Sequence, residues 1–292
     1  MELAIFGNTM KDIPIARLPS QKEPSLLGSF TIRDIEKLLA KTDMVQELHR
    51  HDFYFLLVLQ KGIGEHIIDF KPYEVSDGSI FFMRPGQVHQ LTLKTGSSGF
   101  VVQFTPDFYL PKDQKSLMLL NRASSKNHCH INPLDFEPMN KVLSQIFQEY
   151  TGKKEGYEKV IMAYMDIFFV NLLRHQKSAS LIPNRHEQEG LESFLHLLET
   201  HYSTHKRVSD YANMLHLSLY QLNAITKSAL GKTCSEIIVD RIVLEAKRYL
   251  LATSNQIKEI AFQLGYEDVS YFVRFFKRQT GHSPESFRQL FT

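Results

Sequence analysis

The sequence has few cysteines, no long hydrophobic run and little net charge. Its 292 residues include only two cysteines, Cys129 and Cys234. They are too few for a disulfide framework and too far apart for a metal-binding motif. The apolar run Phe53–Leu59 is far shorter than the roughly 18 to 20 residues that cross a membrane. We therefore expect a soluble protein of a reducing compartment, the cytoplasm, with no membrane partner.

The composition excludes several further classes of protein. Apolar residues make up 43% of the chain and charged residues 23%, a balance typical of globular domains and not of disordered or collagen-like chains. The start Met1-Glu2-Leu3-Ala4 lacks the basic residues of a signal peptide, so none is expected. The net charge of +2 does not by itself indicate a nucleic-acid partner. At about 150 residues per domain, the length suggests two domains.

Glycine and proline are concentrated in the first half of the chain. Eight of the 14 glycines precede residue 100, and nine of the 11 prolines precede residue 139. The apolar segments between them predict short strands at His49–Leu59, Gly64–Phe70, Ser79–Met83, Gln87–Leu93 and Gly99–Phe104. This spacing is typical of an antiparallel sandwich or a small barrel. The segment His128–His130 is expected in a loop.

The pattern becomes helical from Pro138 onward. Apolar residues then recur at steps of three and four, first over 139–150 and again after Gly156. The second helix carries two apolar stripes. We expect one stripe to pack on the barrel and the other on a second copy of the chain, which gives a homodimer. The alternative is that both stripes are buried within one subunit.

The polar stretch that follows, with Pro183, predicts a linker. We therefore divide the chain into a barrel at 1–137, a helical pair at 138–176, a linker at 177–189 and a helical domain at 190–292.

Two segments of the helical domain follow the same plan, at 208–229 and at 257–279. In each, a short helix with a small residue, Ala212 or Ala261, precedes a sharp turn and a longer helix with one apolar and one polar face. This plan predicts two helix-turn-helix units. The segment between them predicts one amphipathic helix of roughly 25 Å, which would hold the two units about one DNA turn, roughly 34 Å, apart.

Charge follows the same division. Residues 206–232 hold four Lys/Arg against one Asp, and residues 269–292 hold four against one Glu. The intervening residues 233–268 hold four Lys/Arg against six Asp/Glu. Positive charge is therefore concentrated in the two units, where DNA phosphates would lie.

A specific run of residues links this domain to a known family. The run consists of Glu245–Leu251, Ile257–Ala261, Leu264–Tyr266, Ser270–Arg278, Gly281–Pro284 and Phe287–Arg288. It matches the signature of the AraC/XylS family of bacterial transcription regulators, and residues 190–292 resemble the whole DNA-binding domain of that family. The resemblance implies DNA contacts from Ser218, Tyr220, Asn223 and Lys227 in the first unit and from Ser270, Tyr271, Arg274, Lys277 and Arg278 in the second.

The first unit departs from the family pattern. Ala224 stands where the family commonly has a basic residue, and Thr226 stands where it commonly has Phe. The first longer helix therefore has no Arg, the residue that makes the commonest specific contact with guanine. We expect it to bind weakly or through asparagine–adenine, methyl and stacking contacts. The second unit, which has Arg274, is expected to contribute more than the first to the discrimination between DNA sequences.

The strand pattern around three histidines resembles the cupin-like sensor domain of the same family. Enzymatic cupins hold a metal with two His and one Glu on one strand and a further His on a later strand. His49, His51 and His89 stand near those places, but no Glu follows His51, and strand alternation puts Asp52 on the opposite face. We expect His49, His51, Phe53 and His89 to line an effector pocket, with no cofactor and no tightly bound metal. Zinc or iron bound by three imidazoles remains the alternative.

These observations predict an α+β protein of two domains. The first is a cupin-like, jelly-roll barrel with a helical pair, and the second is all-α, with two helix-turn-helix units joined by a long helix. The function predicted is that of a non-enzymatic transcription regulator that binds double-stranded operator DNA, senses a small molecule and forms a homodimer. Two alternatives remain open: a metal-dependent cupin enzyme fused to a DNA-binding module, and a regulator controlled by a protein partner.

Overall fold

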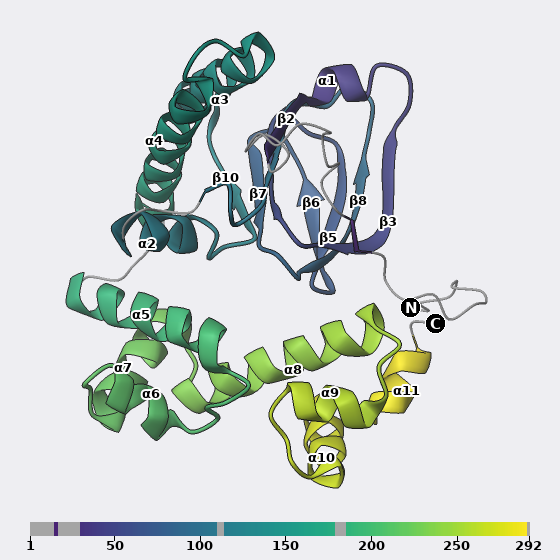
Figure 1. The fold of residues 1–292 in the computed structure, drawn as a ribbon, viewed down its shortest axis with the longest axis vertical. Helices are drawn as coiled ribbons and strands as arrows, with labels where there is room; N and C mark the ends of the chain where they lie inside the picture. Colours follow the sequence, from purple (N-terminus) through teal and green to yellow (C-terminus); the bar gives the residue numbers. More distant parts are fainter. Residues whose placement is uncertain (1–14, 17–29, 110–113, 179–184, 291–292) are drawn as a thin grey trace. The chain divides into compact units, whose positions relative to one another are not determined.

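A computed structural model describes residues 15–16, 30–109, 114–178 and 185–290. The chain divides into two compact units on either side of residue 180, and each is described by itself (Figure 1). Most of the linker predicted at 177–189 lies outside the described residues. The described parts of that stretch are helical, because helix α4 continues to Ser178 and helix α5 begins at Arg185. The two helices therefore extend into both ends of the stretch predicted as a linker.

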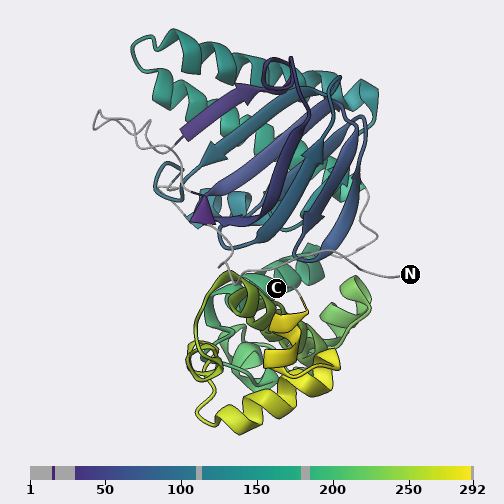
Figure 2. The same ribbon diagram turned by 90° about the vertical axis from the view of Figure 1, so that its right-hand side faces the viewer.

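The N-terminal unit contains two five-stranded sheets (Figure 2). The first has the order β1 (Ile15–Ala16), β3 (Met44–His51), β8 (Val88–Leu93), β5 (Gly64–Ile68) and β6 (Lys71–Val75). The second has the order β10 (His128–His130), β7 (Ser79–Met83), β4 (Tyr54–Lys61), β9 (Ser98–Phe104) and β2 (Phe30–Asp34). Apart from the parallel β1–β3 pair, the recorded pairings are antiparallel.

Strand β4 is apolar along most of its length because both of its faces are buried. Phe55, Leu57 and Leu59 belong to the core between the two sheets. The alternate residues Leu56 and Val58 belong to a second core on the other side of the same sheet. Side chains alternate along a strand, so a strand that is covered on both sides needs apolar residues at every position.

Three helices cover the outer face of the second sheet: α2 (Gln114–Ala123), α3 (Pro133–Gly152) and α4 (Tyr157–Ser178). Asn132 caps α3 by accepting from the Asp135 N–H, and Pro133 takes the first helical position, where no N–H is needed. The helix therefore starts earlier than the predicted Pro138. Phe169 of α4 stacks on Phe82 of β7 with ring centroids 5.5 Å apart, which joins helix and sheet.

The second apolar stripe of α4, which could have faced a second copy of the chain, is part of this subunit's own core. Met165 and Phe169 are buried there, and Met162 and Leu173 pack against it. Two other residues of α4, Val160 and Ile167, are exposed by 37% and 47%.

Two details of the strand prediction are wrong. The predicted strand His49–Leu59 is split by a bend at Asp52-Phe53 into β3 and β4, which belong to different sheets. The segment His128–His130 is an edge strand paired with β7 and not a loop. The short helix α1 (Ile35–Leu38) follows β2 directly.

The C-terminal unit is entirely helical in its described part. It contains α5 (Arg185–His201), α6 (Val208–Met214), α7 (Leu219–Leu230), α8 (Cys234–Ala252), α9 (Ile257–Gln263), α10 (Val269–Thr280) and α11 (Pro284–Gln289). Helix α8 lies between the two helix pairs, with α6 and α7 at its start and α9 and α10 near its end (Figure 1). The predicted two-domain α+β fold is confirmed. Among the described helices, none combines the length and apolar character that crossing a membrane requires.

Candidate nucleic-acid interface and histidine cluster

The two helix pairs of the C-terminal unit turn in the same way. In the first, the Leu217 N–H donates to the carbonyl of Ala212 at 2.9 Å, and in the second the Tyr266 N–H donates to the carbonyl of Ala261 at 2.9 Å. The residue before each donor has a left-handed backbone, with φ of 54° at His216 and 74° at Gly265. The same hydrogen bond closes both turns, so the pairs are two copies of one helix-turn-helix unit.

Side chains fix the start of the longer helix in each unit. Ser218 accepts from the Gln221 N–H, and the Gln221 side chain accepts from the Ser218 N–H, which makes a capping box at α7. Asp268 accepts from the N–H groups of Ser270 and Tyr271 at 2.7 and 3.2 Å, which caps α10.

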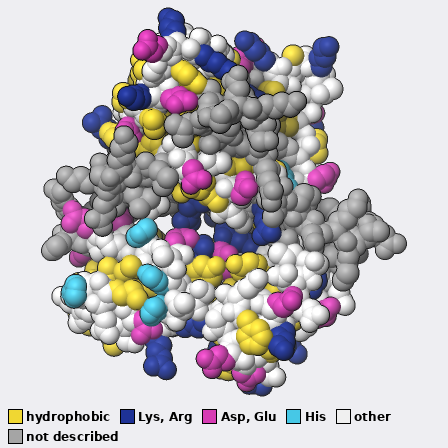
Figure 3. All heavy atoms as spheres, viewed as in Figure 1, with side chains coloured by type: hydrophobic (Ala, Val, Ile, Leu, Met, Phe, Trp, Pro, Cys, Tyr) yellow, Lys and Arg dark blue, Asp and Glu magenta, His cyan; other side chains and the backbone are white. Residues whose placement is uncertain are grey.

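The faces of α7 and α10 divide as the sequence predicts. Their inner faces bury Leu222, Ile225 and Thr226 on α7 and Phe272, Phe275 and Phe276 on α10. Of the predicted DNA-contacting residues, the structure leaves exposed Ser218, Tyr220, Lys227, Ser270, Tyr271, Arg274, Lys277 and Arg278. Figure 3 shows basic side chains on the outer margin of this unit, over α10. Tyr220 is 84% exposed and Tyr271 is 53% exposed, so neither ring is buried against a neighbouring helix.

Asn223 differs from the other predicted contacts. Its side chain is partly buried, its Oδ1 accepts from the Cys234 N–H at 3.0 Å, and its Nδ2 donates to the Leu219 carbonyl at 3.0 Å. The amide therefore joins α7 to the start of α8. Sequence reasoning missed this role, because the partner lies beyond the end of the helix.

Several residues of the matching sequence run hold the unit together. Arg241 of α8 bridges Glu199 of α5 at 2.9 Å and Glu245 at 2.8 Å, and Arg248 pairs with Glu245 as well. Arg288 of α11 donates to the carbonyl of Leu250 at 2.9 Å. These contacts fix α5 and α11 on α8, so these charged residues serve the architecture of the unit.

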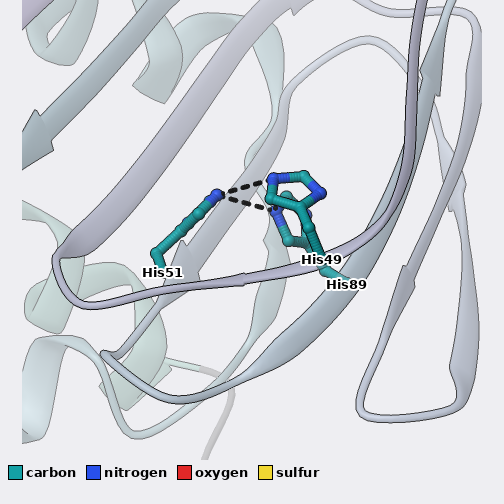
Figure 4. A group of neighbouring side chains, drawn as sticks. All are labelled: His49, His51 and His89. Atoms are coloured by element: carbon teal, nitrogen blue, oxygen red, sulfur yellow. Dashed lines mark hydrogen bonds between the residues drawn. The ribbon is translucent and has the colours of Figure 1, made fainter. Parts of the chain in front are cut away.

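The N-terminal unit brings three of the predicted histidines into contact (Figure 4). The Nε2 atoms of His49 and His51 are 2.8 Å apart, and the Nε2 atom of His89 lies 3.1 Å from each of them. His49 and His89 are direct cross-strand partners on β3 and β8. His51 lies two residues further along β3 and approaches the other two rings from the opposite side (Figure 4).

A fourth histidine extends the cluster. His66 of β5 is fully buried, and its Nε2 lies 2.8 Å from Nδ1 of His89. The Nδ1 of His49 lies 2.7 Å from the carbonyl oxygen of Glu47. Sequence reasoning missed His66, because the pairing of β5 with β8 is not visible in the local pattern. The signal available was its place on the same strand face as the buried Ile68.

Aromatic rings surround these imidazoles. Phe53 stacks on His51 with ring centroids 4.3 Å apart, and Phe55 lies 5.4 Å from both His51 and His89. Burial, together with neighbouring imidazoles, lowers the pKa of His51 and of His66 to about 3 and holds the pKa of His89 well below its ordinary value. These three rings are therefore neutral at pH 7. Of the four residues predicted to line an effector pocket, His51, Phe53 and His89 are buried, and His49 lies partly buried beside them.

Comparison with known proteins gives the family. Residues 40–160 match the model of the AraC-like ligand binding domain, and residues 211–290 match a helix-turn-helix domain model. The regulator YfiF of Bacillus subtilis is 25% identical over 254 residues, covering 84% of this chain and 79% of that protein. The activator RhaS of Enterobacter sp. is 23% identical over 245 residues, covering 82% of this chain and 87% of that protein.

Solved structures also align with the chain. The alignment with ToxT of Vibrio cholerae O395 covers 90% of this chain and 98% of the ToxT chain, with 17% identity and a TM-score of 0.41. The C-terminal domain of the response regulator yesN of Fusobacterium nucleatum covers 34% of this chain and 98% of its own, with 29% identity and a TM-score of 0.32.

The N-terminal sheets and the paired helix-turn-helix units together define a transcriptional regulator with a ligand-binding and a DNA-binding domain. The chain belongs to the AraC family of transcriptional regulators.

Proposed function

We propose that this regulator binds double-stranded operator DNA with the exposed faces of α7 and α10, each of which enters one stretch of major groove as a recognition helix. The observation that carries the proposal is the repeated unit, with the same turn hydrogen bond and the same inner and outer faces in both copies. Helix α8, of 19 residues, is roughly 28 Å long and separates the units by a distance similar to one DNA turn.

The two recognition helices have different tasks in this proposal. Arg274 is exposed in the middle of α10, on the side away from Phe272 and Phe276, and we assign it to a base edge. Lys277 and Arg278 follow in the last turn and are assigned to phosphates. Serine and tyrosine side chains, Ser270 and Tyr271, flank the start of the helix and complete this contact set.

Helix α7 offers a weaker set of contacts. Ala224 takes the place on α7 that Arg274 takes on α10, so the first unit relies on Ser218, Tyr220 and Lys227. We assign Asn223 to the joint between α7 and α8 and not to adenine, because both ends of its amide are bonded to backbone. The operator half under α7 is therefore read less strictly than the half under α10.

The effector site of the proposal is the interior of the N-terminal unit around His49, His51, Phe53 and His89. What supports it is the match of residues 40–160 to a ligand-binding domain and the grouping of polar imidazoles inside an otherwise apolar core. Such a site suits a small molecule with a few polar groups, since imidazole nitrogens can donate or accept hydrogen bonds.

The remaining parts of the proposal concern assembly and location. The chain acts as a homodimer, and the exposed side of α4 with Val160 and Ile167 is the surface we assign to the contact.

The histidine cluster serves sensing and not catalysis, as the relatives are regulators. A protein that works on bacterial DNA acts in the cytoplasm. We keep 190–292 as the DNA-binding domain and 1–137 with the helical pair 138–176 as the sensor.

The experiment is a selection of bound fragments from a random double-stranded DNA library with the full chain, followed by equilibrium binding across a series of salt concentrations. The proposal requires one enriched motif and an affinity that falls steeply and linearly with salt on logarithmic axes. Recovery of unenriched DNA would contradict sequence-specific binding.

A further inference from the structure

Three imidazole nitrogens meet at one point inside the barrel. The Nε2 atoms of His49, His51 and His89 lie 2.8, 3.1 and 3.1 Å from one another, so each touches both of the others (Figure 4). Each contact is short enough for a hydrogen bond, but protons cannot satisfy all three. A ring nitrogen carries either a proton or a lone pair, so two of any three such atoms must be alike.

Two like nitrogens in contact repel each other. Two protonated nitrogens have no acceptor between them, and two lone pairs have no donor. This holds for every tautomer of the three rings and for every protonation state, so at least one of the three contacts is unfavourable. The core around the cluster is buried and apolar, where an unmet polar contact costs most.

A single cation removes the conflict, because all three lone pairs can then point at one electron-pair acceptor. Nitrogen–zinc bonds are about 2.0 to 2.1 Å long, and two nitrogens on one tetrahedral zinc lie roughly 3.3 Å apart. The nitrogen–nitrogen separations in the cluster, of 2.8, 3.1 and 3.1 Å, are 0.2 to 0.5 Å shorter than that. We propose that the Nε2 atoms of His49, His51 and His89 form a binding site for a divalent first-row transition metal of the zinc class.

The outer nitrogens of two rings favour this orientation. His49 donates from Nδ1 to the Glu47 carbonyl oxygen at 2.7 Å, which leaves its Nε2 as a lone pair. When the Nδ1 of His89 donates to the Nε2 of His66 at 2.8 Å, the Nε2 of His89 is a lone pair too. Metal-ligating histidines commonly hold their second nitrogen in this way, which makes His66 a positioning residue for His89.

The donor set determines the class of metal. Three imidazoles suit zinc, cobalt, nickel, copper and iron, whereas magnesium and calcium require oxygen ligands. Among the described residues, the candidate ligand group contains three histidines and no carboxylate. The missing carboxylate was the reason to expect no tightly bound metal. Three-histidine zinc sites need none, because the fourth position takes water or another oxygen donor.

The test uses the full chain, stripped with a chelator and titrated with Co²⁺ alone. Four-coordinate Co²⁺ gives strong visible d–d absorption, and histidine-only ligation gives no thiolate charge-transfer band in the near ultraviolet. The proposal predicts one Co²⁺ per chain, displaced by one Zn²⁺. A thiolate band would place the metal at a cysteine and overturn the assignment.

Variants locate the metal. His51→Ala and His49→Ala are each expected to weaken Co²⁺ binding by about 100-fold or more, and His66→Ala by about 10-fold through the loss of its bond to His89. His49 is only partly buried, so its variant keeps the test valid if His51→Ala fails to fold. Circular dichroism checks folding.

The matched control is the double variant His201→Ala/His205→Ala. These two rings of the C-terminal unit have centroids 5.4 Å apart, and Figure 3 shows histidine side chains on the surface of that unit. The control is expected to bind Co²⁺ as the parent does. Absence of the visible band in the parent, its persistence in the folded His49 and His51 variants, or its loss in the control would each overturn the proposal.

Discussion

Gly265 holds in the second helix-turn-helix unit the backbone position that His216 holds in the first. Both residues have a left-handed backbone, with φ of 74° and 54°, and both precede the residue whose N–H closes the turn. The two positions differ in their surroundings. A Cβ on Gly265 would lie 1.8 Å from the carbonyl oxygen of Ser203, so only glycine fits there, whereas the same position in the first unit holds the side chain of His216.

This difference predicts a large effect on stability for a substitution at Gly265 and a small one for a substitution at His216. Gly265→Ala should lower the free energy of unfolding by more than about 2 kcal/mol, because it adds left-handed strain to a steric clash. His216→Gly should change it by less than about 1 kcal/mol, since relief of strain offsets the larger entropy of the unfolded chain. Urea unfolding followed by circular dichroism measures both. Equal effects would contradict the steric difference between the two turns.

Arg274→Ala should weaken binding to the selected operator by about 1 to 3 kcal/mol and relax base choice at one position. The physical reason is the loss of a two-pronged contact from the centre of α10. The comparison variant is Lys277→Ala, which should lower the affinity for operator DNA and for scrambled DNA to similar extents. Competition binding on operators substituted one base at a time provides the measurement. Equal losses on operator and scrambled DNA would assign Arg274 to phosphate.

Asn223→Ala should lower the free energy of unfolding by about 1 to 2 kcal/mol, because one hydrogen bond that joins α7 to α8 and one within α7 are lost. The ratio of operator to scrambled-DNA affinity should stay as in the parent. Unfolding and binding are measured on the same preparation. A changed base preference with unchanged stability would mean that Asn223 contacts a DNA base.

The Cys234 thiol should stay protonated in the folded chain. Burial raises its pKa to about 12 from an ordinary value of 9.0. Because the folded-state pKa is the higher one, the thiol's contribution to stability is fully present below about pH 9 and decreases as the pH rises from there toward 12. In a Cys129→Ser variant, a thiol reagent at about pH 8 should react only after unfolding. Fast labelling of the native variant would contradict this.

The sequence predicts the C-terminal unit more completely than the barrel. The features of a helix-turn-helix lie close together in the chain, as the small Ala261, the turn glycine Gly265 and the cap Asp268 do. The contacts of Asn223 with Cys234 and of Arg288 with Leu250 are not predictable, because they depend on how separate helices pack.

In the barrel, local alternation was enough to bring His49 and His51 to one place. It was not enough to show that the strand bends at Asp52-Phe53, where neither glycine nor proline marks a turn. His66 is buried beside His89 because β5 pairs with β8, although the two histidines are 23 residues apart in the sequence. Such pairings depend on the topology of the sheet and leave no local pattern. Strand β6 was missed because Pro72 interrupts it, which an edge strand tolerates.

Hydroxyl-radical footprinting of the full chain on its selected operator tests the central claim most directly. Two recognition helices on one α8 predict two protected patches on one face of the duplex, with centres about 10 base pairs apart. In Arg274→Ala, protection should weaken in one patch first. A single patch, or two patches on opposite faces of the duplex, would contradict the account of two helix-turn-helix units acting together.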